Sequence, residues 1–213
     1  GNSSQSSAFL DNPGNRNNWN NHYGQYLAEA GYEAFNVIGG GAEVAENFAY
    51  YFGHDATGQL EHYGNHIEGR DLIAYRNNYM TGNDADAVSF SEPGRSGQRM
   101  DRADGSANMW ANANAAAQAY KAAGDTEKAA EMQQIADAIK QDVLGNLWDS
   151  DSKLLLHKWL NDGQFAKYKE LNNYYPYSEG LMPIGNDDYD SALRLFEDAD
   201  EFPIFPFFTA NQA

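Results

Sequence analysis

The sequence predicts a mainly α-helical chain built from helical hairpins, with a small β-hairpin between helices. Residues 106–123 and 126–148 both carry apolar side chains at helical spacing, and Gly124-Asp125 separates them. This pattern is typical of two antiparallel helices joined by a tight turn. Between residues 153 and 171, two short runs flank Asn161-Asp162-Gly163, which is typical of a β-hairpin. Helix pairs of this kind occur in α/α toroids and in helical-repeat arrays, and periodicity alone leaves both open.

The N-terminal part predicts two further helices. Residues 1–20 are dense in Asn, Ser and Gly, a composition typical of a loop. Residues 21–34 place Tyr and Leu on one helical face, and we expect that helix to end near Gly31. Residues 42–52 form a better amphipathic pattern, which Gly53 should end.

The two long helices carry clear local signals. The first is rich in alanine, so neighbouring helices can approach it closely, and Asp125 or Thr126 should cap the second. Beyond the β-hairpin we expect a loop at 172–177 and an amphipathic helix at 188–199. The predicted buried stripe of the second long helix consists of Met132, Ile135, Ile139, Val143 and Leu147.

Composition excludes several classes of protein. A chain of 213 residues is long enough for a sizeable core. Its formal net charge of −17 would repel a phosphate backbone, so we expect no nucleic-acid partner. The chain has no cysteine, which excludes disulfides, zinc–thiolate sites and a thiol nucleophile. Its apolar runs are too short to span a membrane.

The two ends of the sequence differ from ordinary chain termini. The first seven residues are small and polar and hold no signal-peptide pattern, whereas residues 202–208 are strongly apolar. Terminal residues are usually polar and loosely held. We therefore expect residues 1–213 to be one partial domain, truncated at one or both ends.

Two carboxyl side chains lie on a glycine-bearing loop. Asp84 and Asp86 follow Thr81-Gly82 and precede a short apolar run, with Tyr, Asn and Arg residues on both sides. A carboxylic acid in such surroundings is suited to act as a general acid on a sugar. Aspartates here also fit an Asx-turn or a helix cap, and the residues alone favour that structural role.

Metal-binding patterns are weak. His62 and His66 have the spacing of two zinc ligands on one helical face, but Gly64 lies between them and the Glu of H-E-x-x-H is absent. We therefore expect no zinc site. The acidic clusters Asp149-x-Asp151 and Asp187-Asp188 could hold Ca²⁺, although solvated surface acids are the commoner case. No cofactor is predicted.

Aromatic residues make up 14% of the chain, and many lie beside Asn and Gly in loops. Flat rings with a polar tip suit sugar faces, whereas ordinary core packing is the alternative for each of them. Tyr174 and Tyr175, in an Asn-rich segment, fit both roles equally.

Thr81-Gly82-Asn83-Asp84 resembles the Ser-Gly-x-Asp signature of six-hairpin (α/α)6 glycoside hydrolases, a clan that includes family 63 glucosidases and mannosylglycerate hydrolase-like enzymes. The resemblance extends from about Tyr51 to Gln212, and a β-L-arabinobiosidase-like member is the nearest relative it suggests. It implies that the chain is part of an (α/α)6 toroid, with Asp84 as general acid. The signature's later Arg, acid and helical Asn correspond to Arg99, Asp101 and Asn112 or Asn114, at stretched spacing.

This sequence departs from the clan's pattern in two ways. Asp86 stands where the signature continues Ser-Pro-Arg, so it could be the acid itself or keep Asp84 protonated by like-charge repulsion. The second carboxylate has no clear match: Glu179 and Glu201 are available, and a base beyond Ala213 is expected. Residues expected to line sugar subsites are Asn65, His66, Arg99, Asp101, Trp110, Asn112 and Tyr175.

The resulting hypothesis is a glycosidase acting on an oligosaccharide or polysaccharide, in a bacterial protein working outside the cytoplasm. The alternatives are a tetratricopeptide-like module that binds glycans without cleaving them, and a purely structural helical repeat. An α/α polysaccharide lyase is less favoured, because its Tyr, His and Arg set has no clear cluster here. Catalysis requires that sugar release depend on one carboxylate, whereas binding would be spread over the aromatic residues.

Overall fold

The chain of the computed structural model folds into two compact units. Unit 1 comprises residues 1–73 and 108–141, and unit 2 comprises residues 74–107 and 142–213. The described residues are mainly helical with a few short antiparallel strands, as the sequence predicts. None of the helices in this part of the chain is long and apolar enough to cross a membrane. The residues that the structure describes are 28–50, 64–65, 72–76, 88, 99–159 and 162–202.

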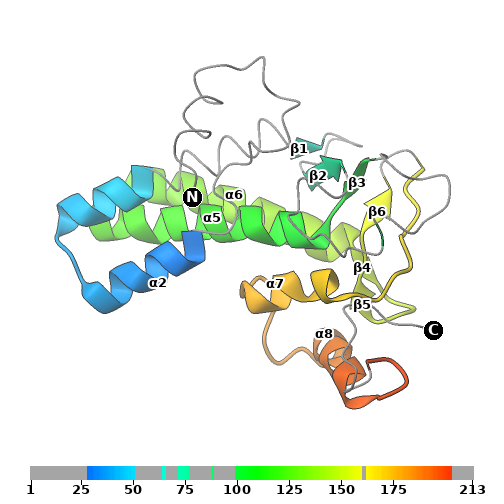
Figure 1. The fold of residues 1–213 in the computed structure, drawn as a ribbon. Coiled ribbons are helices and arrows are strands. Elements are labelled where there is room, and N and C mark those ends of the chain that lie inside the picture. The colour runs from blue at the N-terminus through cyan, green and yellow to red at the C-terminus, as the bar shows by residue number, and fades with distance from the viewer. Residues whose placement is uncertain are drawn as a thin grey trace. The chain divides into compact units, whose positions relative to one another are not determined.

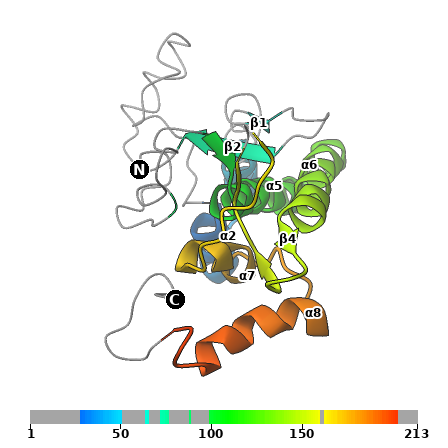
Figure 2. The ribbon, with the colours of Figure 1, turned by 90° about the vertical axis from the view of Figure 1, so that its right-hand side faces the viewer.

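Unit 1 contains most of the predicted helical hairpin. Helices α5 (Ala103–Ala123) and α6 (Thr126–Asn146) lie side by side in both Figure 1 and Figure 2. In the turn between them, the Asp125 backbone N–H donates to the Tyr120 carbonyl at 2.9 Å. The Asp125 side chain accepts from the Lys128 backbone N–H at 3.1 Å, which confirms Asp125 as the cap of α6.

Small side chains form the contact between the two helices of the hairpin. Alanines of α5 supply most of the buried cluster, and Met132 and Ala136 of α6 pack on them. Alanine has no side-chain entropy to lose and allows close approach of helix backbones. On α6 the predicted stripe is confirmed, since Ile139 and Val143 are also buried. The cluster consists of Ala113, Ala115, Ala116, Ala117, Met132 and Ala136, with Phe48, Trp110, Tyr120 and Ile135 packed against it.

Two N-terminal helical segments precede the hairpin in unit 1. They are α2 (Ala28–Ile38) and residues 42–50, and their Phe35 and Phe48 rings pack with centroids 5.8 Å apart. Helix α2 continues through Gly31, where the sequence predicts its end, and stops at Gly39 instead. An internal glycine costs a helix only about 1 kcal/mol. Gly39, with φ of +71°, takes the left-handed conformation that ends helices.

Two glycines of the hairpin should respond to alanine in opposite directions. Gly124 has φ of +87° and Gly145 lies inside α6, and a Cβ at either position would meet no atom within 4 Å. Gly124→Ala should therefore lower the free energy of unfolding by about 1–2 kcal/mol through backbone strain alone. Gly145→Ala should raise it by about 0.5–1 kcal/mol, because alanine loses less entropy in a helix. Urea unfolding of both variants checks the pair, and equal effects would contradict this account of the turn.

The strands are short and antiparallel. In unit 1, β1 (Gly64–Asn65) pairs with the first two residues of β2 (Leu72–Arg76). In unit 2, the rest of β2 pairs with β3 (Arg99–Asp101), and β3 pairs with β6 (Lys158–Trp159). Strand β3 is paired with β2 on one side and with β6 on the other. It leads directly into α5, and we call this junction the β3–α5 corner.

A second hairpin in unit 2 replaces the end of the predicted helix 126–148. Helix α6 ends at Asn146, and β4 (Trp148–Asp149) pairs with β5 (Leu154–Leu155). Trp148 continues the helical spacing of apolar residues in the sequence, but its backbone pairs with Leu155. Its ring packs edge-on against the Tyr189 ring, with the two ring centroids 4.7 Å apart. Strand pairing and packing thus outweigh helical periodicity here.

The predicted hairpin around 161–163 is present but shorter than expected. The Trp159 backbone N–H donates to the Gln164 carbonyl, and Gly163 donates back to Trp159, both at 2.9 Å. One further bridge joins Lys158 to Phe165. The predicted strand 153–160 is split, since β5 and β6 pair in different sheets.

Residues 172–177 are helical, so the predicted loop is wrong. The 3₁₀ helix η3 (Leu171–Tyr174) leads into α7 (Tyr175–Ser178). Pro176 lies in the first turn of α7, where its missing N–H is no loss. The predicted helix 188–199 is confirmed in outline, as α8 (Asp187–Asp190) followed by the 3₁₀ helix η4 (Ser191–Glu197).

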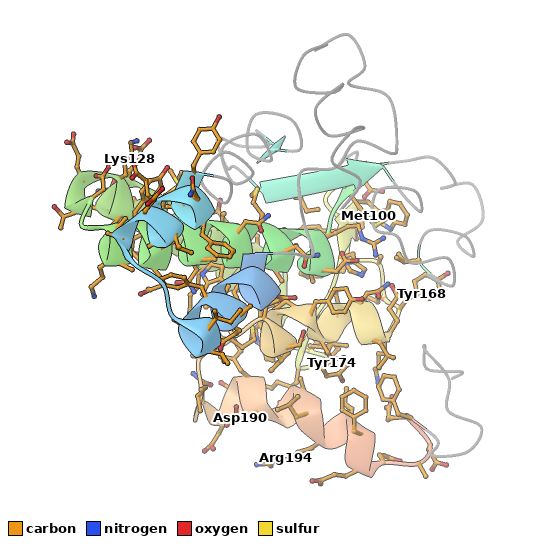
Figure 3. The ribbon with its side chains drawn as sticks, turned by 60° about the vertical axis from the view of Figure 1, so that its left-hand side comes forward. Met100, Lys128, Tyr168, Tyr174, Asp190 and Arg194 are labelled. Atoms are coloured by element: carbon orange, nitrogen blue, oxygen red, sulfur yellow. The ribbon has the colours of Figure 1, made fainter. Side chains whose placement is uncertain are left out.

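Aromatic side chains form the core beneath η3 and η4 in unit 2. Tyr174, labelled in Figure 3, packs against Phe196 and Phe202, with ring centroids 4.6 and 6.1 Å away. Its hydroxyl donates to the Ala192 carbonyl at 2.9 Å, and burial raises the pKa of the Tyr174 phenol. The alternative of core packing is thus observed for Tyr174. A separate buried cluster contains Val88, Met100, Trp159 and Ala166, with Tyr168 packed against it.

Candidate functional site

Asp84, Asp86 and His66 lie outside the described residues. Asn65 pairs with Leu72 in unit 1, and the backbone of Arg99 lies opposite Arg76 in unit 2.

The other predicted site residues divide between the two units. In unit 1, Asn112 is fully buried in α5, and Trp110 packs against the alanine cluster with the Lys140 ammonium 5.9 Å from its ring centroid. In unit 2, Asp101 is buried at the end of β3, and Tyr175 begins α7. Arg99 and Asp101 lie two residues apart in β3.

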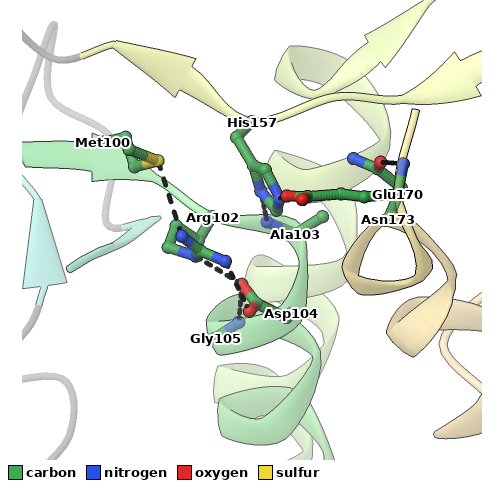
Figure 4. Close-up of polar contacts among 8 residues, drawn as sticks. All are labelled: Met100, Arg102, Ala103, Asp104, Gly105, His157, Glu170 and Asn173. Atoms are coloured by element: carbon green, nitrogen blue, oxygen red, sulfur yellow. Dashed lines mark hydrogen bonds and ion pairs between the residues drawn. The ribbon is translucent and has the colours of Figure 1, made fainter. Parts of the chain in front are cut away.

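Unit 2 contains a buried polar cluster that the sequence did not predict. We use this name for Arg102, Asp104, His157, Glu170 and Asn173, which come from three segments of the chain (Figure 4). Each of these residues is at most 2% exposed. Burying this many charged groups requires that they pair with one another and with backbone groups.

The first part of the cluster is an ion pair at the start of α5. Arg102 Nε donates to Asp104 Oδ1 at 2.8 Å, and Nη2 donates to Oδ2 at 2.9 Å. Asp104 Oδ1 also accepts from the Gly105 backbone N–H at 2.8 Å, satisfying one free donor of the first helical turn. The negative charge of Asp104 also faces the positive end of the helix dipole.

The ion pair determines the charge state of Asp104. Burial alone would raise the pKa of this carboxyl group, but the guanidinium of Arg102 and the hydrogen bonds to Arg102 and Gly105 outweigh burial. The pKa of Asp104 therefore lies below its ordinary value, and the folded chain holds it as a carboxylate.

The second part of the cluster is a histidine with both ring nitrogens in contact. His157 Nδ1 accepts from the Ala103 backbone N–H at 3.1 Å, and Nε2 lies 3.3 Å from Glu170 Oε1. A nitrogen that accepts a hydrogen bond carries no proton, so a neutral His157 has its proton on Nε2, facing the carboxylate.

Glu170 in turn caps η3. Its backbone N–H donates to the Asn173 side-chain oxygen at 2.8 Å, and the Asn173 backbone N–H donates to the Glu170 carbonyl at 3.0 Å. The two residues form a capping box at the start of η3. His157 therefore connects the first turn of α5 with the first turn of η3, within unit 2.

The sequence carried only faint signals for this cluster. Asp104 lies in the first turn of the alanine-rich helix α5, where acidic residues are common, and His157 follows three leucines that are all buried. The contact between Ala103 and His157 spans 54 positions in the sequence. The hydrogen bonds of the cluster to the Ala103 and Gly105 backbone N–H groups suit it to fixing the backbone at the first turn of α5.

Other acids considered for catalysis or metal binding have partners. Glu201 receives the Lys169 ammonium at 2.7 and 2.8 Å, and Asp188 pairs with Lys153 at 2.9 Å. Asp149 accepts from the Ser152 hydroxyl at 2.7 Å. Among the described residues, no group of three His, Asp or Glu side chains is arranged to hold a metal ion.

Known proteins share the fold of this chain. A sialidase matches with a TM-score of 0.68 and 18% identity, over 80% of this chain and 15% of its own. A GH78 family rhamnosidase of Bacillus sp. GL1 matches with a TM-score of 0.50 and 15% identity, over 72% of this chain and 15% of its own. The chain thus spans about one seventh of the length of these proteins, and the similarity concerns the fold.

The family comparison covers nearly the whole sequence. Residues 19–210 match the mannosylglycerate hydrolase MGH1-like glycoside hydrolase domain. The matched range includes Asp84, Asp86 and all five residues of the buried polar cluster. The chain belongs to the mannosylglycerate hydrolase MGH1-like glycoside hydrolase family.

Proposed function

We propose that this chain is part of the catalytic domain of a glycosidase that cleaves an oligosaccharide or polysaccharide with a carboxylic general acid. The family match over residues 19–210 carries the proposal. The antiparallel helical hairpin of α5 and α6 supports an α/α architecture. In this proposal the chain supplies a part of an (α/α)6 toroid, because its structural neighbours are several times longer.

Asp84 is the proposed general acid. In its protonated form it gives its proton to the glycosidic oxygen as the leaving group departs. Asp86, two residues away, disfavours a second negative charge nearby and so helps to keep that proton in place. The mechanism requires two carboxyl groups and water, and it involves no cofactor.

We propose that the second carboxylate belongs to a residue beyond Ala213. Glu201 is engaged by Lys169, which leaves it poorly suited to activate water. A carboxyl separation of about 6.5–9.5 Å would give inversion, and about 5–5.5 Å would give retention. The resemblance to six-hairpin enzymes favours inversion.

The buried polar cluster has a supporting role in this proposal. Arg99 and Asp101 lie in β3, and Arg102 follows directly at the start of α5. Rigid secondary structure holds catalytic groups more accurately than loops do. The bidentate Arg102–Asp104 pair thus holds the β3–α5 corner, from which Arg99 and Asp101 would contact sugar hydroxyls or orient Asp84. Asn65, His66, Trp110, Asn112 and Tyr175 would line the sugar subsites.

The test is sugar release by the full protein of which this chain is proposed to be a part, here called the parent protein. A panel of nitrophenyl glycosides and oligosaccharides, including arabinobiosides, is incubated with the protein, and binding of each compound is measured by calorimetry in parallel. The proposal expects at least one substrate to be cleaved with turnover. Binding without release across the whole panel would overturn it in favour of a glycan-binding module.

A further inference from the structure

Strongly exposed apolar side chains gather in one short segment of unit 1. Val37 and Ile38 are 85% and 82% exposed, and Val44 is 41% exposed. Among the described residues, four of the seven large apolar side chains that are exposed lie between positions 37 and 50. Exposed apolar residues that are scattered singly are normal, whereas a group of them marks a contact surface.

The exposed apolar residues of α2 share one helical face. Ala34, Val37 and Ile38 are three and four positions apart, so they are neighbours on the helix surface, and all three are exposed. We call this surface the α2 face. Phe35 lies on another side of α2, where its ring packs against the Phe48 ring with the centroids 5.8 Å apart. Helix α2 therefore has one apolar side that packs within the chain and a second that stays exposed.

The N-terminal hairpin, formed by α2 and residues 42–50, packs on the rest of unit 1 through other residues. Ala45 and Ala49 are buried, and Phe48 packs against the alanine cluster of α5 and α6. Arrays of helix pairs end in a pair whose outer face is polar. The apolar α2 face therefore indicates that the N-terminal hairpin is an inner member of such an array, with a further helix beside it.

The charges near the α2 face are of one sign. Residues 28–50 contain no Lys, Arg or His, and their four acidic residues are Glu29, Glu33, Glu43 and Glu46. A helix that carries Lys or Arg beside an apolar stripe would match both features, because complementary charges at the edges of an apolar contact select the partner.

We propose that the α2 face packs against an amphipathic helix of the parent protein that lies outside residues 1–213 and carries Lys or Arg beside its apolar stripe. The inference rests on the part of the proposed function that makes this chain a piece of a larger α/α domain. The chain covers only 15% of each structural neighbour, so most of a domain of that length lies elsewhere in the parent protein. A second copy of the chain and a segment of residues 1–213 are the alternative occupants, which the experiment separates.

Photocrosslinking in the parent protein tests the proposal. The benzophenone amino acid p-benzoylphenylalanine replaces Ile38, and mass spectrometry identifies the peptide to which it joins on irradiation. The proposal expects a peptide outside residues 1–213 with an amphipathic helical pattern and with Lys or Arg beside its apolar stripe. Asn36, an exposed polar residue in the same turn of α2, takes the probe as the matched control and should not join to that peptide.

Each of the other crosslinking results would overturn the proposal. Joining to another part of residues 1–213 in the same molecule would show that the chain covers the α2 face itself. Joining between molecules, detected by mixing isotope-labelled and unlabelled protein, would show that a second copy covers it. The absence of any joined peptide at position 38, or the same peptide from position 36 in equal yield, would remove the α2 face as a docking surface.

Two charge variants of the parent protein test the same contact without a probe. Ile38→Asp would place a carboxylate in the apolar contact and should lower the melting temperature by about 5 °C or more. Asn36→Asp adds the same charge to the same last turn of α2, so the helix dipole affects both variants alike. It should change the melting temperature by about 2 °C or less. Equal shifts in the two variants would contradict the proposal.

These measurements do not depend on sugar release, so the two proposals can fail separately. A parent protein that cleaves sugars but gives no crosslink from position 38 would refute the docking of the α2 face alone. A parent protein that gives the expected crosslink but cleaves no sugar would refute the glycosidase activity alone.

Discussion

Replacing Asp84 by Asn should lower kcat on natural oligosaccharides by about 10²–10⁴-fold, the usual contribution of a general acid. Asparagine keeps the shape of aspartate but has no proton to donate. The loss should be small on dinitrophenyl glycosides, because that leaving group departs without protonation. Steady-state kinetics on both substrate classes, using the parent protein, measure the difference.

Asp86→Asn is the matched control for this prediction. It changes the same charge on the same loop, two residues away. If Asp84 is the acid, Asp86→Asn keeps turnover on natural substrates and shifts only the alkaline limb of the pH profile. The reverse pattern would assign the acid to Asp86, and normal rates in both variants would remove the loop from the mechanism.

Arg102→Met should lower the free energy of unfolding by about 3–5 kcal/mol, because it leaves the buried Asp104 carboxylate without its charge partner. Both side chains are at most 2% exposed, so water cannot replace the guanidinium. Urea unfolding measures the loss. Lys153→Met is the matched control: its pair with Asp188 is 47% and 72% exposed and should contribute about 1 kcal/mol or less.

A double variant distinguishes charge from packing in this prediction. If an unpaired charge causes the loss, Arg102→Met combined with Asp104→Asn should be more stable than Arg102→Met alone. An additive loss would instead assign the effect to packing.

Acid should also weaken the wild type through Asp104. Its pKa is lowered in the folded chain, so its contribution to stability is present above the ordinary carboxyl pKa and is lost as the pH falls through the folded value. This loss should be smaller in Asp104→Asn, and pH-dependent unfolding curves of the two proteins compare it.

The parts of the fold that the sequence predicted depend on local signals. The α5–α6 turn follows from a glycine with positive φ and a capping Asp125 beside it. The α6 stripe follows from helical spacing of Met132, Ile139 and Val143. These features need no knowledge of distant residues.

The features that sequence reasoning missed depend on strand pairing, capping and burial, which composition and helical spacing do not show. Trp148 keeps the helical period, but β5 draws its backbone into a strand. Residues 172–177 have the composition of a loop, whereas the capping box of Glu170 and Pro176 in α7 make them helical. Burial of Arg102 and Glu170 follows from contacts with Asp104 and His157, and charged residues are exposed in most sequences.

The candidate site likewise has one part that sequence motifs predicted and another part that only the fold shows. The family resemblance was predicted from short motifs, and the match over residues 19–210 confirms it. Asp84 and Asp86 remain predictions, because both lie outside the described residues. The buried polar cluster was found only from the fold.

Proton NMR of the parent protein's reaction with an oligosaccharide tests the central claim most directly. The account predicts a new reducing-end signal that grows with time and is absent in the Asp84→Asn, Asp86→Asn double variant. The anomer that appears first also reports inversion or retention. A reducing-end signal that grows equally in the double variant would contradict the account, and so would its absence with every oligosaccharide that the protein binds.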